Sequence, residues 1–443
     1  MFSIKRIRIL TIIGVFIFSV EAHAQKSQSD STLTDATLNQ VIEYALGHQP
    51  LVKQAQLDQE ITDQVIKGKL ADWYPQINFV YNYQHTAELQ TSIFGGNPTK
   101  VGVNNLSAAQ FNGTQTLFNR DVLLAKKTAS TVEAQSSQLT SRTKIDVVVN
   151  VTKAFYDVLA TTQQIKIGQE DIIRLQRSLK DATSQYKAGV ADKTDYKRAT
   201  ILLKNSQATL KSNQEQLKFK EKYLKTLMGY PLNADMHIAY DTLQMENEVA
   251  LDTTMALDYM KNIDYKILFT QKELQKANVS YSKWAYLPSA NLFASYILNY
   301  QNNNFYELYQ TKFPYSYVGA TLSLPLFQGG KRKANVQQQK LSLDRIDWDL
   351  TNLQNTLGTE YERALAAYKS SLVNYLALRD NVELAREVYD VIQLQYKNGV
   401  RAYLDVTVAE TDLRTARINY FNALYQVLAS KMDVQRALGE INY

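Results

Sequence analysis

The stretch Gln395-Tyr396-Lys397-Asn398-Gly399-Val400 repeats, with one change, a stretch that begins 210 positions earlier, Gln185-Tyr186-Lys187-Ala188-Gly189-Val190. Each copy is followed at the same distance by an aspartate, Asp195 in the first and Asp405 in the second. A glycine that closes a helix-favouring run is typical of a helix end. The pair of copies therefore predicts a duplicated unit that forms two helical hairpins.

The runs that precede the two glycines are long and free of proline. Residues 121–187 and residues 331–397 each span 67 positions without one. A continuous helix of that length would extend about 100 Å, far beyond the thickness of a bilayer. We expect each run to be one long helix that turns at a tip, 188–194 in the first hairpin and 398–404 in the second, into a shorter return helix.

Two stretches of alternating polar and apolar residues come before each long run. They predict strands at about 76–87 and 106–118 and again at about 289–300 and 315–327. The preceding helices are stopped by proline, at Pro75 and Pro288. Each predicted strand is close to the ~9–11 residues that a tilted transmembrane strand requires.

The order of elements is therefore helix, strand pair, long helix and return helix, performed twice. It divides the chain into residues 25–250 and 251–443, with a mixed segment at about 230–258 where the halves meet. Residues 1–24 have a basic start, an apolar run and a small-residue site at Ala22-His23-Ala24, and they are interpreted as a secretory signal peptide.

Composition excludes several classes of function. The chain has no cysteine, a net charge of +6 and no basic cluster, so disulfides, thiol chemistry and nucleic-acid binding are not expected. His48, His85 and His237 lie in unrelated elements, and no catalytic or metal-ligand spacing accompanies them. Five methionines between Met228 and Met260 are interpreted as gap-filling residues rather than as a copper site. We expect neither an enzyme nor a cofactor.

Four strands cannot form a closed barrel alone. In lipid, each unpaired backbone group at an open sheet edge costs several kcal/mol, and single-chain barrels have at least eight strands. The four strands therefore predict a barrel shared among copies of the chain. Two copies would give eight strands and a filled interior, whereas three would give twelve strands and a lumen. The 29 tyrosines suit the aromatic girdles of membrane interfaces.

The whole mature chain resembles the TolC family of outer-membrane efflux and secretion channels. The resemblance rests on Tyr74-Pro75 and Leu287-Pro288 at the strand entries, on Leu326-Phe327-Gln328-Gly329-Gly330 after the last strand, and on the paired tips. It implies a mixed α+β membrane protein: a homotrimer with a shared twelve-stranded β-barrel in the outer membrane of a Gram-negative bacterium and an α-helical tunnel in the periplasm. It also implies passive exit for the substrates of a tripartite pump or type I secretion system, with a periplasmic adaptor and an energy-supplying inner-membrane transporter as partners.

The resemblance also assigns roles to residues at the tips. Gly189-Val190 and Gly399-Val400 would contact the adaptor, although glycines at these places also simply end helices. Asp405 would form a ring of negative charge at the periplasmic aperture. Tyr396 with Asp195, and Arg401 with Thr194, would hold that aperture closed.

Two alternatives stay open at this point. Asp195 and Asp405 also suit the first turn of a helix, where a carboxylate is favoured. The position three residues after Asp405, where the family has a second aspartate, is Val408, so the charge ring would be single. In a different class, the long hairpins alone would fit a soluble periplasmic coiled-coil adaptor or scaffold.

Overall fold

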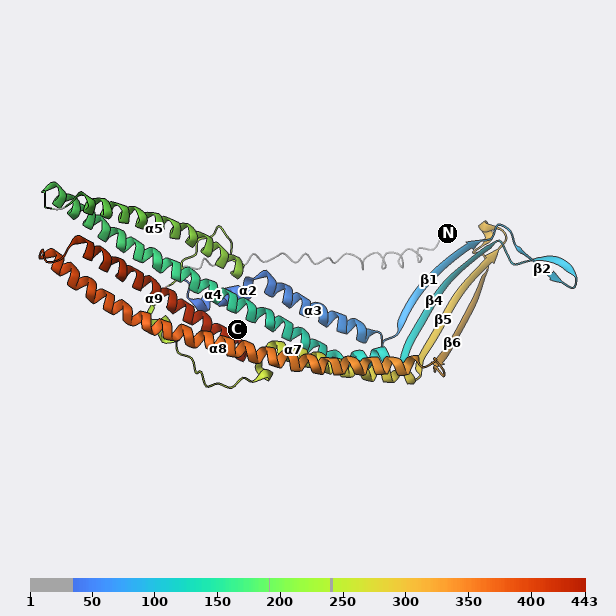
Figure 1. Cartoon of the computed structure of the whole chain (residues 1–443). Helices are drawn as coiled ribbons and strands as arrows, with labels where there is room; N and C mark the ends of the chain where they lie inside the picture. The colour runs from blue at the N-terminus through green and yellow to red at the C-terminus, as the bar shows by residue number, and fades with distance from the viewer. Residues whose placement is uncertain (1–34, 191, 240–241) are drawn as a thin grey trace.

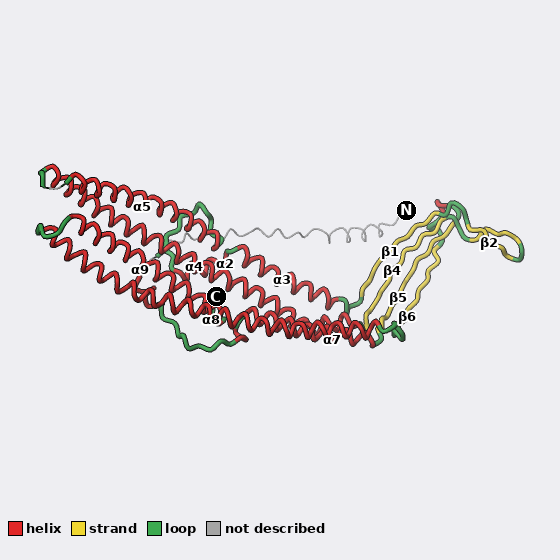
Figure 2. The backbone as a smooth tube through the Cα atoms, viewed as in Figure 1, coloured by secondary structure: helices red, strands yellow, loops and turns green. Residues whose placement is uncertain are grey.

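The structure is a computed structural model that describes residues 35–190, 192–239 and 242–443. The predicted signal peptide, residues 1–24, lies outside these ranges. Helices gather at one end of the described chain and strands at the other (Figure 2).

Two long helical hairpins dominate the described part of the chain (Figure 1). The first consists of α4 (Arg120–Lys187) and α5 (Lys193–Met228), and the second of α8 (Lys331–Lys397) and α9 (Tyr403–Leu438). These bounds confirm the predicted long helices and return helices. The shorter helical elements are α2 (Leu38–His48), α3 (Pro50–Ala71), α6 (Thr242–Glu248), η2 (Tyr259–Lys261), α7 (Ile263–Lys283), η3 (Trp284–Tyr286) and η4 (Phe305–Glu307).

The four strands of the sheet pair in the order β1-β4-β5-β6, all antiparallel. They are β1 (Gln76–His85), β4 (Asn105–Phe118), β5 (Ser289–Asn302) and β6 (Lys312–Ser323). The last strand was predicted about three residues too late. Its final pair joins Ser323 to Ser289, where β5 begins after Pro288, so residues beyond Ser323 have no partner on β5. Pro325 could not donate to a ladder in any case.

A second, two-stranded sheet lies between β1 and β4, in a segment for which no strand was predicted. It consists of β2 (Gln90–Phe94) and β3 (Asn97–Val101). Gly95 and Gly96 form its turn, both with positive φ (58° and 88°), a conformation that glycine adopts without steric cost.

The two faces of the four-stranded sheet differ in chemistry. On one face, Phe79, Phe111 and Tyr296 follow one another across three strands, and the two phenylalanine rings lie 4.9 Å apart. On the other face, the hydroxyl of Ser295 donates to Asn112 Oδ1 at 2.8 Å and accepts from Gln110 Nε2 at 3.3 Å. One side therefore suits lipid and the other suits water.

The hairpin helices lie side by side in the order α5, α4, α9, α8 (Figure 1). Nearer the sheet, α3 packs on α4 and α7 packs on α8. In a single chain, α5 and α8 are therefore the edges of the helical layer. Among the described residues, the structure contains no helix that is long and apolar enough to cross a membrane.

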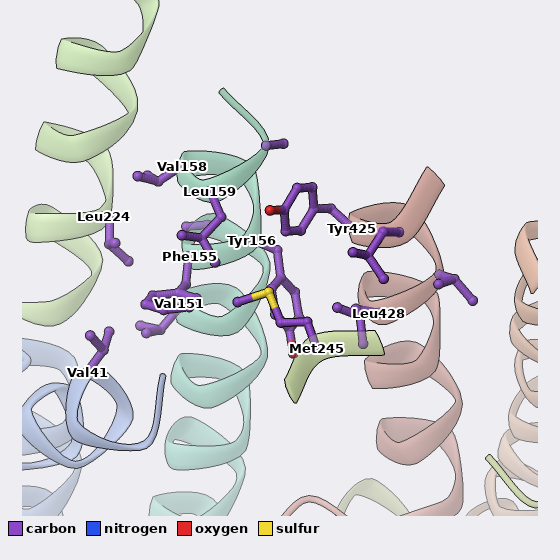
Figure 3. Packing of buried hydrophobic residues seen from close by; sticks show 14 of the residues in the cluster. Val41, Val151, Phe155, Tyr156, Val158, Leu159, Leu224, Met245, Tyr425 and Leu428 are labelled. Atoms are coloured by element: carbon purple, nitrogen blue, oxygen red, sulfur yellow. The ribbon is translucent and has the colours of Figure 1, made fainter. Parts of the chain in front are cut away.

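The largest hydrophobic core lies where the two hairpins end near the middle of the molecule. In Figure 3, α4 lies between Val41 of α2 and Leu224 of α5 on one side and Tyr425 and Leu428 of α9, with Met245 of α6, on the other. Phe155, Leu159 and Leu428 are almost fully buried. We call this level of the molecule the equator.

Candidate functional site at the hairpin tips

Both tips are built in the same way. After α4, the N–H of Val190 donates to the carbonyl of Gln185 at 3.0 Å, and Gly189 has a φ of 74°. After α8, the N–H of Val400 donates to Gln395 at 2.9 Å, and Gly399 has a φ of 73°. Together with the bonds from the two glycines, this pattern is a Schellman motif, which satisfies the last carbonyls of a helix.

The valines that follow the glycines are strongly exposed. Val190 is 76% exposed and Val400 is 71% exposed. An exposed apolar side chain beside a rigid glycine turn suits a docking contact, and the surroundings offer space, because a Cβ added at Gly189 or Gly399 would meet no atom within 4 Å.

The first hairpin begins its return helix with a side-chain cap. Both the N–H and the hydroxyl of Thr194 donate to Asp192 Oδ1 at 2.7 Å, which lowers the pKa of the Asp192 carboxyl. The helix cap is therefore Asp192 rather than Asp195. Asp195 lies in the first turn, where its charge faces the positive end of the helix.

In the second hairpin, the return helix begins at Ala402 without a side-chain cap. Asp405 lies in the first turn of α9 and forms an ion pair with Arg401, N to O 3.7 Å. Arg401 also donates from Nε to Gln395 Oε1 at 3.2 Å. Both partners of the ion pair are well exposed, so the pair is weak and easily exchanged for another.

Within one chain, the residues predicted to hold the aperture closed bind partners other than the predicted ones. The hydroxyl of Tyr396 donates to Gln185 Oε1 at 3.1 Å and not to Asp195. Arg401 contacts Asp405 and Gln395, while Thr194 bonds to Asp192. The physical reason is position: Asp195 and Thr194 belong to α5, and α4 lies between α5 and the second hairpin.

Sequence reasoning missed a group of charged residues farther from the tips, which we call the charged cluster: Asp171, Arg174, Glu410 and Arg414. Asp171 and Glu410 are buried. Burial and the neighbouring Asp171 raise the pKa of the Glu410 carboxyl. A signal was present in the sequence, since Asp171 stands between Ile167 and Leu175 in an otherwise apolar helical stripe.

A sheet with one face for lipid and one for water, joined to helices far too long for a bilayer, is the architecture expected of a subunit of an outer-membrane channel. The comparisons with known proteins agree. The sequence profile described as "Outer membrane efflux protein" matches residues 41–230 and 271–440.

The relatives cover most of the chain. The outer membrane protein TolC of Salmonella enteritidis is 22% identical over 434 residues, which cover 93% of this chain and 84% of that protein. The proteases secretion protein PrtF of Dickeya chrysanthemi is 21% identical and covers 90% of this chain and 87% of its own. The crystal structure of VceC from Vibrio cholerae superposes with a TM-score of 0.71 at 14% identity, over 91% of this chain and 96% of that one.

The chain therefore belongs to the outer membrane efflux protein family. It is an efflux or secretion channel of the outer membrane of a Gram-negative bacterium, of the kind that serves tripartite pumps or type I secretion, and it is a transport protein rather than an enzyme. This assignment decides against the soluble adaptor that the hairpins alone would have allowed.

Proposed function

We propose that three copies of the chain close one channel, with a shared twelve-stranded barrel and a tunnel of hairpin helices. The observation that carries the proposal is the four-stranded sheet, whose edge strands β1 and β6 each have one unpaired side. Its apolar face is exposed in the single chain, with Phe79 at 58% and Val318 at 83%. Pairing β6 of one copy with β1 of the next removes both open edges, and twelve strands leave a lumen.

The edges of the helical layer support the same assembly. Residues 193–204 of α5 carry four basic residues and one acidic residue, whereas residues 380–390 of α8 carry four acidic residues and one basic residue. The four basic residues of α5 and the four acidic residues of α8 are all exposed: Lys193, Lys197, Arg198 and Lys204, and Asp380, Glu383, Glu387 and Asp390. The edge of α8 also exposes Leu384, Val388 and Val391. A basic edge and an acidic, partly apolar edge, both in the halves of the helices nearer the tips, fit each other when copies stand side by side.

In this assembly, the closing pairs predicted for the tips form between copies. Thr194 and Asp195 belong to α5, Tyr396 belongs to α8, and Arg401 lies in the turn between α8 and α9. Contacts between neighbours would close the aperture, and the ring of Asp405 would favour cations. Arg401 is shared between Thr194 of the neighbour and Asp405 of its own chain, so it partly neutralises the ring whenever the pair across the boundary is broken.

The partners follow from the same proposal. The exposed turns at Gly189-Val190 and Gly399-Val400 would bind a periplasmic adaptor, whose docking favours the open arrangement of the tips. An inner-membrane transporter would supply the energy, because a channel of this kind is a passive exit. Outer-membrane lipid would cover the apolar face of the barrel.

The test is the mass of the mature protein extracted from outer-membrane fractions, measured by light scattering with correction for bound detergent. We expect a trimer. A monomer or a dimer would contradict the shared twelve-stranded barrel. Replacing Leu384, Val388 and Val391 together by Asp should lower the yield of trimer, whereas Ile173→Asp, at an exposed position of α4 inside the helical layer rather than at its edge, should leave it unchanged.

A further inference from the structure

The two hairpins of one chain are joined along a seam between α4 and α9. In the part of the chain that the structure describes, six side-chain links cross the seam, and their partners run in opposite directions along the two helices. From the equator toward the tip they are Asp146–Arg436 at 2.6 Å, Lys153–Asp433 at 2.5 Å, Gln164–Asn422 at 2.9 Å, Glu170–Arg417 at 2.7 Å, Asp171–Arg414 at 3.3 Å and Arg174–Glu410 at 3.1 Å.

The last links of this series, in the charged cluster, differ from the others in burial. The side chain of Asp171 is 2% exposed and that of Glu410 is 7% exposed, whereas Lys153 and Asp433 are 37% and 46% exposed. Arg174 reaches both carboxylates, with N to O distances of 3.3 Å to Asp171 and 3.1 Å to Glu410. Two acids and two arginines balance each other.

The charged cluster connects three helices. Asp171 and Arg174 come from α4, Glu410 and Arg414 come from α9, and the hydroxyl of Ser206 on α5 donates to Asp171 Oδ2 at 3.0 Å. Separating the hairpins at this level would break the pair of Asp171 with Arg414 and the pair of Arg174 with Glu410, and breaking a buried ion pair is more costly than breaking a neutral hydrogen bond.

Beyond the cluster, the seam changes character. Among the described residues, no ion pair joins the hairpins on the tip side of Arg174. The side-chain hydrogen bond that crosses there is neutral: the hydroxyl of Tyr396 donates to Gln185 Oε1 at 3.1 Å. This bond lies between the cluster and the glycine turns.

We propose that the charged cluster is the hinge of the aperture: it fixes α4 against α9, so that opening is confined to the helix ends between the cluster and the tips. The inference rests on the proposed gated channel. Glu410 and its partners are positioning residues, since Asp405 stands five residues before Glu410 on the same helix. The charged cluster sets where the Asp405 side chain lies when the tip is closed. When the tip opens, the helix ends move about the charged cluster as a fixed point.

A buried ion-pair cluster has a simpler reading, as an ordinary stabilising contact. Buried ion pairs are poor stabilisers, however, because desolvation offsets most of their attraction, and apolar residues of similar size do as well. What such a cluster supplies is a fixed register between helices. Within the described ranges, the charged cluster is the last ionic link between the hairpins before the tips, and only neutral bonding follows it. For this reason we infer that the charged cluster is a hinge.

The test is hydrogen exchange along α4 in the assembled protein. In the unaltered protein, residues 175–187 should exchange about tenfold faster than residues 161–174, because local opening is cheap only on the tip side. Asp171→Asn, which keeps the shape and removes the charge, should extend the fast region into residues 161–174. Asp433→Asn removes a half-exposed pair of the same seam and is the matched control, with no change expected in residues 161–174.

Two results would overturn the hinge. One is an unchanged exchange rate across the cluster in the unaltered protein, and the other is an Asp171→Asn variant whose residues 161–174 stay as slow as before. If Asp171→Asn does not assemble, Glu410→Gln carries the same test from the other helix. Hydrogen exchange can be measured whether or not the protein conducts. The exchange rates therefore test the hinge, whereas the mass measurement tests the trimeric channel, and either proposal can fail without the other.

Discussion

The equatorial end and the tip end of the same two hairpins are held by different contacts. At the equator, Phe155, Leu159 and Leu428 are buried in a core to which α2, α3, α4, α5, α6, α8 and α9 contribute; Figure 3 shows part of it. At the tips, Val190 and Val400 stand in the open, and exposed pairs such as Arg401 with Asp405 take the place of a core. One continuous helix, α4, is therefore firmly packed over one part of its length and loosely held over another, as a gate that moves at only one end requires.

The glycines at the two ends of each hairpin differ in how closely other atoms approach them. All four hairpin helices end at a glycine with a φ between 70° and 74°. At the equator, a Cβ on Gly229 would lie 2.6 Å from the carbonyl oxygen of His48, and one on Gly439 would lie 2.6 Å from that of Lys261. At the tips, Gly189 and Gly399 have open space. The equatorial glycines are needed for close packing as well as for their conformation, and the tip glycines only for their conformation.

The largest expected difference comes from deleting a side chain at each end. Phe155→Ala empties space in the equatorial core and should lower the free energy of unfolding by about 3–5 kcal/mol. Val190→Ala at the exposed tip should change it by no more than about 0.5 kcal/mol. Denaturant midpoints of the purified protein measure both. Equal losses would mean that the equator is not the stabilising end.

Alanine at the two kinds of glycine should separate packing from conformation. Gly189→Ala should lower the free energy of unfolding by about 1–2 kcal/mol, because alanine is strained in the left-handed conformation. Gly229→Ala has the same strain, and its Cβ must also displace a backbone carbonyl, which should lower the free energy of unfolding by about 1–3 kcal/mol more. The midpoints should therefore fall in the order unaltered, Gly189→Ala, Gly229→Ala. A reversed order would contradict the equatorial close approach.

The gate should respond to changes at the tip that leave stability alone. Arg401→Ala and Tyr396→Phe each remove a hydrogen-bonding group from the proposed closing pairs, so single-channel conductance in a planar bilayer should rise in both. Asp405→Asn should instead reduce the preference for cations. If conductance stays the same in Arg401→Ala and in Tyr396→Phe, the closing pairs have no role in gating.

The smallest effect concerns pH. Burial and Asp171 raise the pKa of Glu410 above its ordinary value of 4.5. A carboxyl whose pKa is raised by folding stabilises the fold while it is protonated, and this contribution is lost as the pH rises from 4.5 through the raised pKa. Glu410→Gln cannot lose a proton, so its stability should change less over that range than the stability of the unaltered protein. Parallel curves of denaturant midpoint against pH would contradict the assignment.

Much of the fold could be predicted because its signals are local. The proline-free run 331–397 coincides with α8, and each tip glycine has the left-handed conformation that a helix end requires. Features that depend on distant partners could not be predicted. The end of β6 is set by where β5 begins, and the hydrogen bond from Tyr396 to Gln185 within one chain is set by which helices are neighbours in the layer.

The candidate site divides in the same way. The tip turns could be read from the repeat, whereas the charged cluster joins residues more than 230 positions apart and needed the register of α4 against α9. The β2–β3 hairpin was missed for another reason. Its strands have only five residues each, and its turn glycines also suit an irregular loop.

The most direct measurement compares the single-channel conductance of two cross-linked variants. In one, the two hairpins are cross-linked near the tip, and in the other they are cross-linked on the equatorial side of the charged cluster. The chain has no cysteine, so Gln185→Cys with Tyr396→Cys, and Gln164→Cys with Asn422→Cys, each allow one defined link with a short bifunctional thiol reagent. Before linking, the tip pair should conduct more than the unaltered protein because the Tyr396 hydroxyl is gone. Linking the tip pair should return conductance to the low level, while linking the Gln164 and Asn422 positions should leave it unchanged. An equal loss of conductance from both links would contradict the account, because it would place the moving boundary on the equatorial side of the charged cluster.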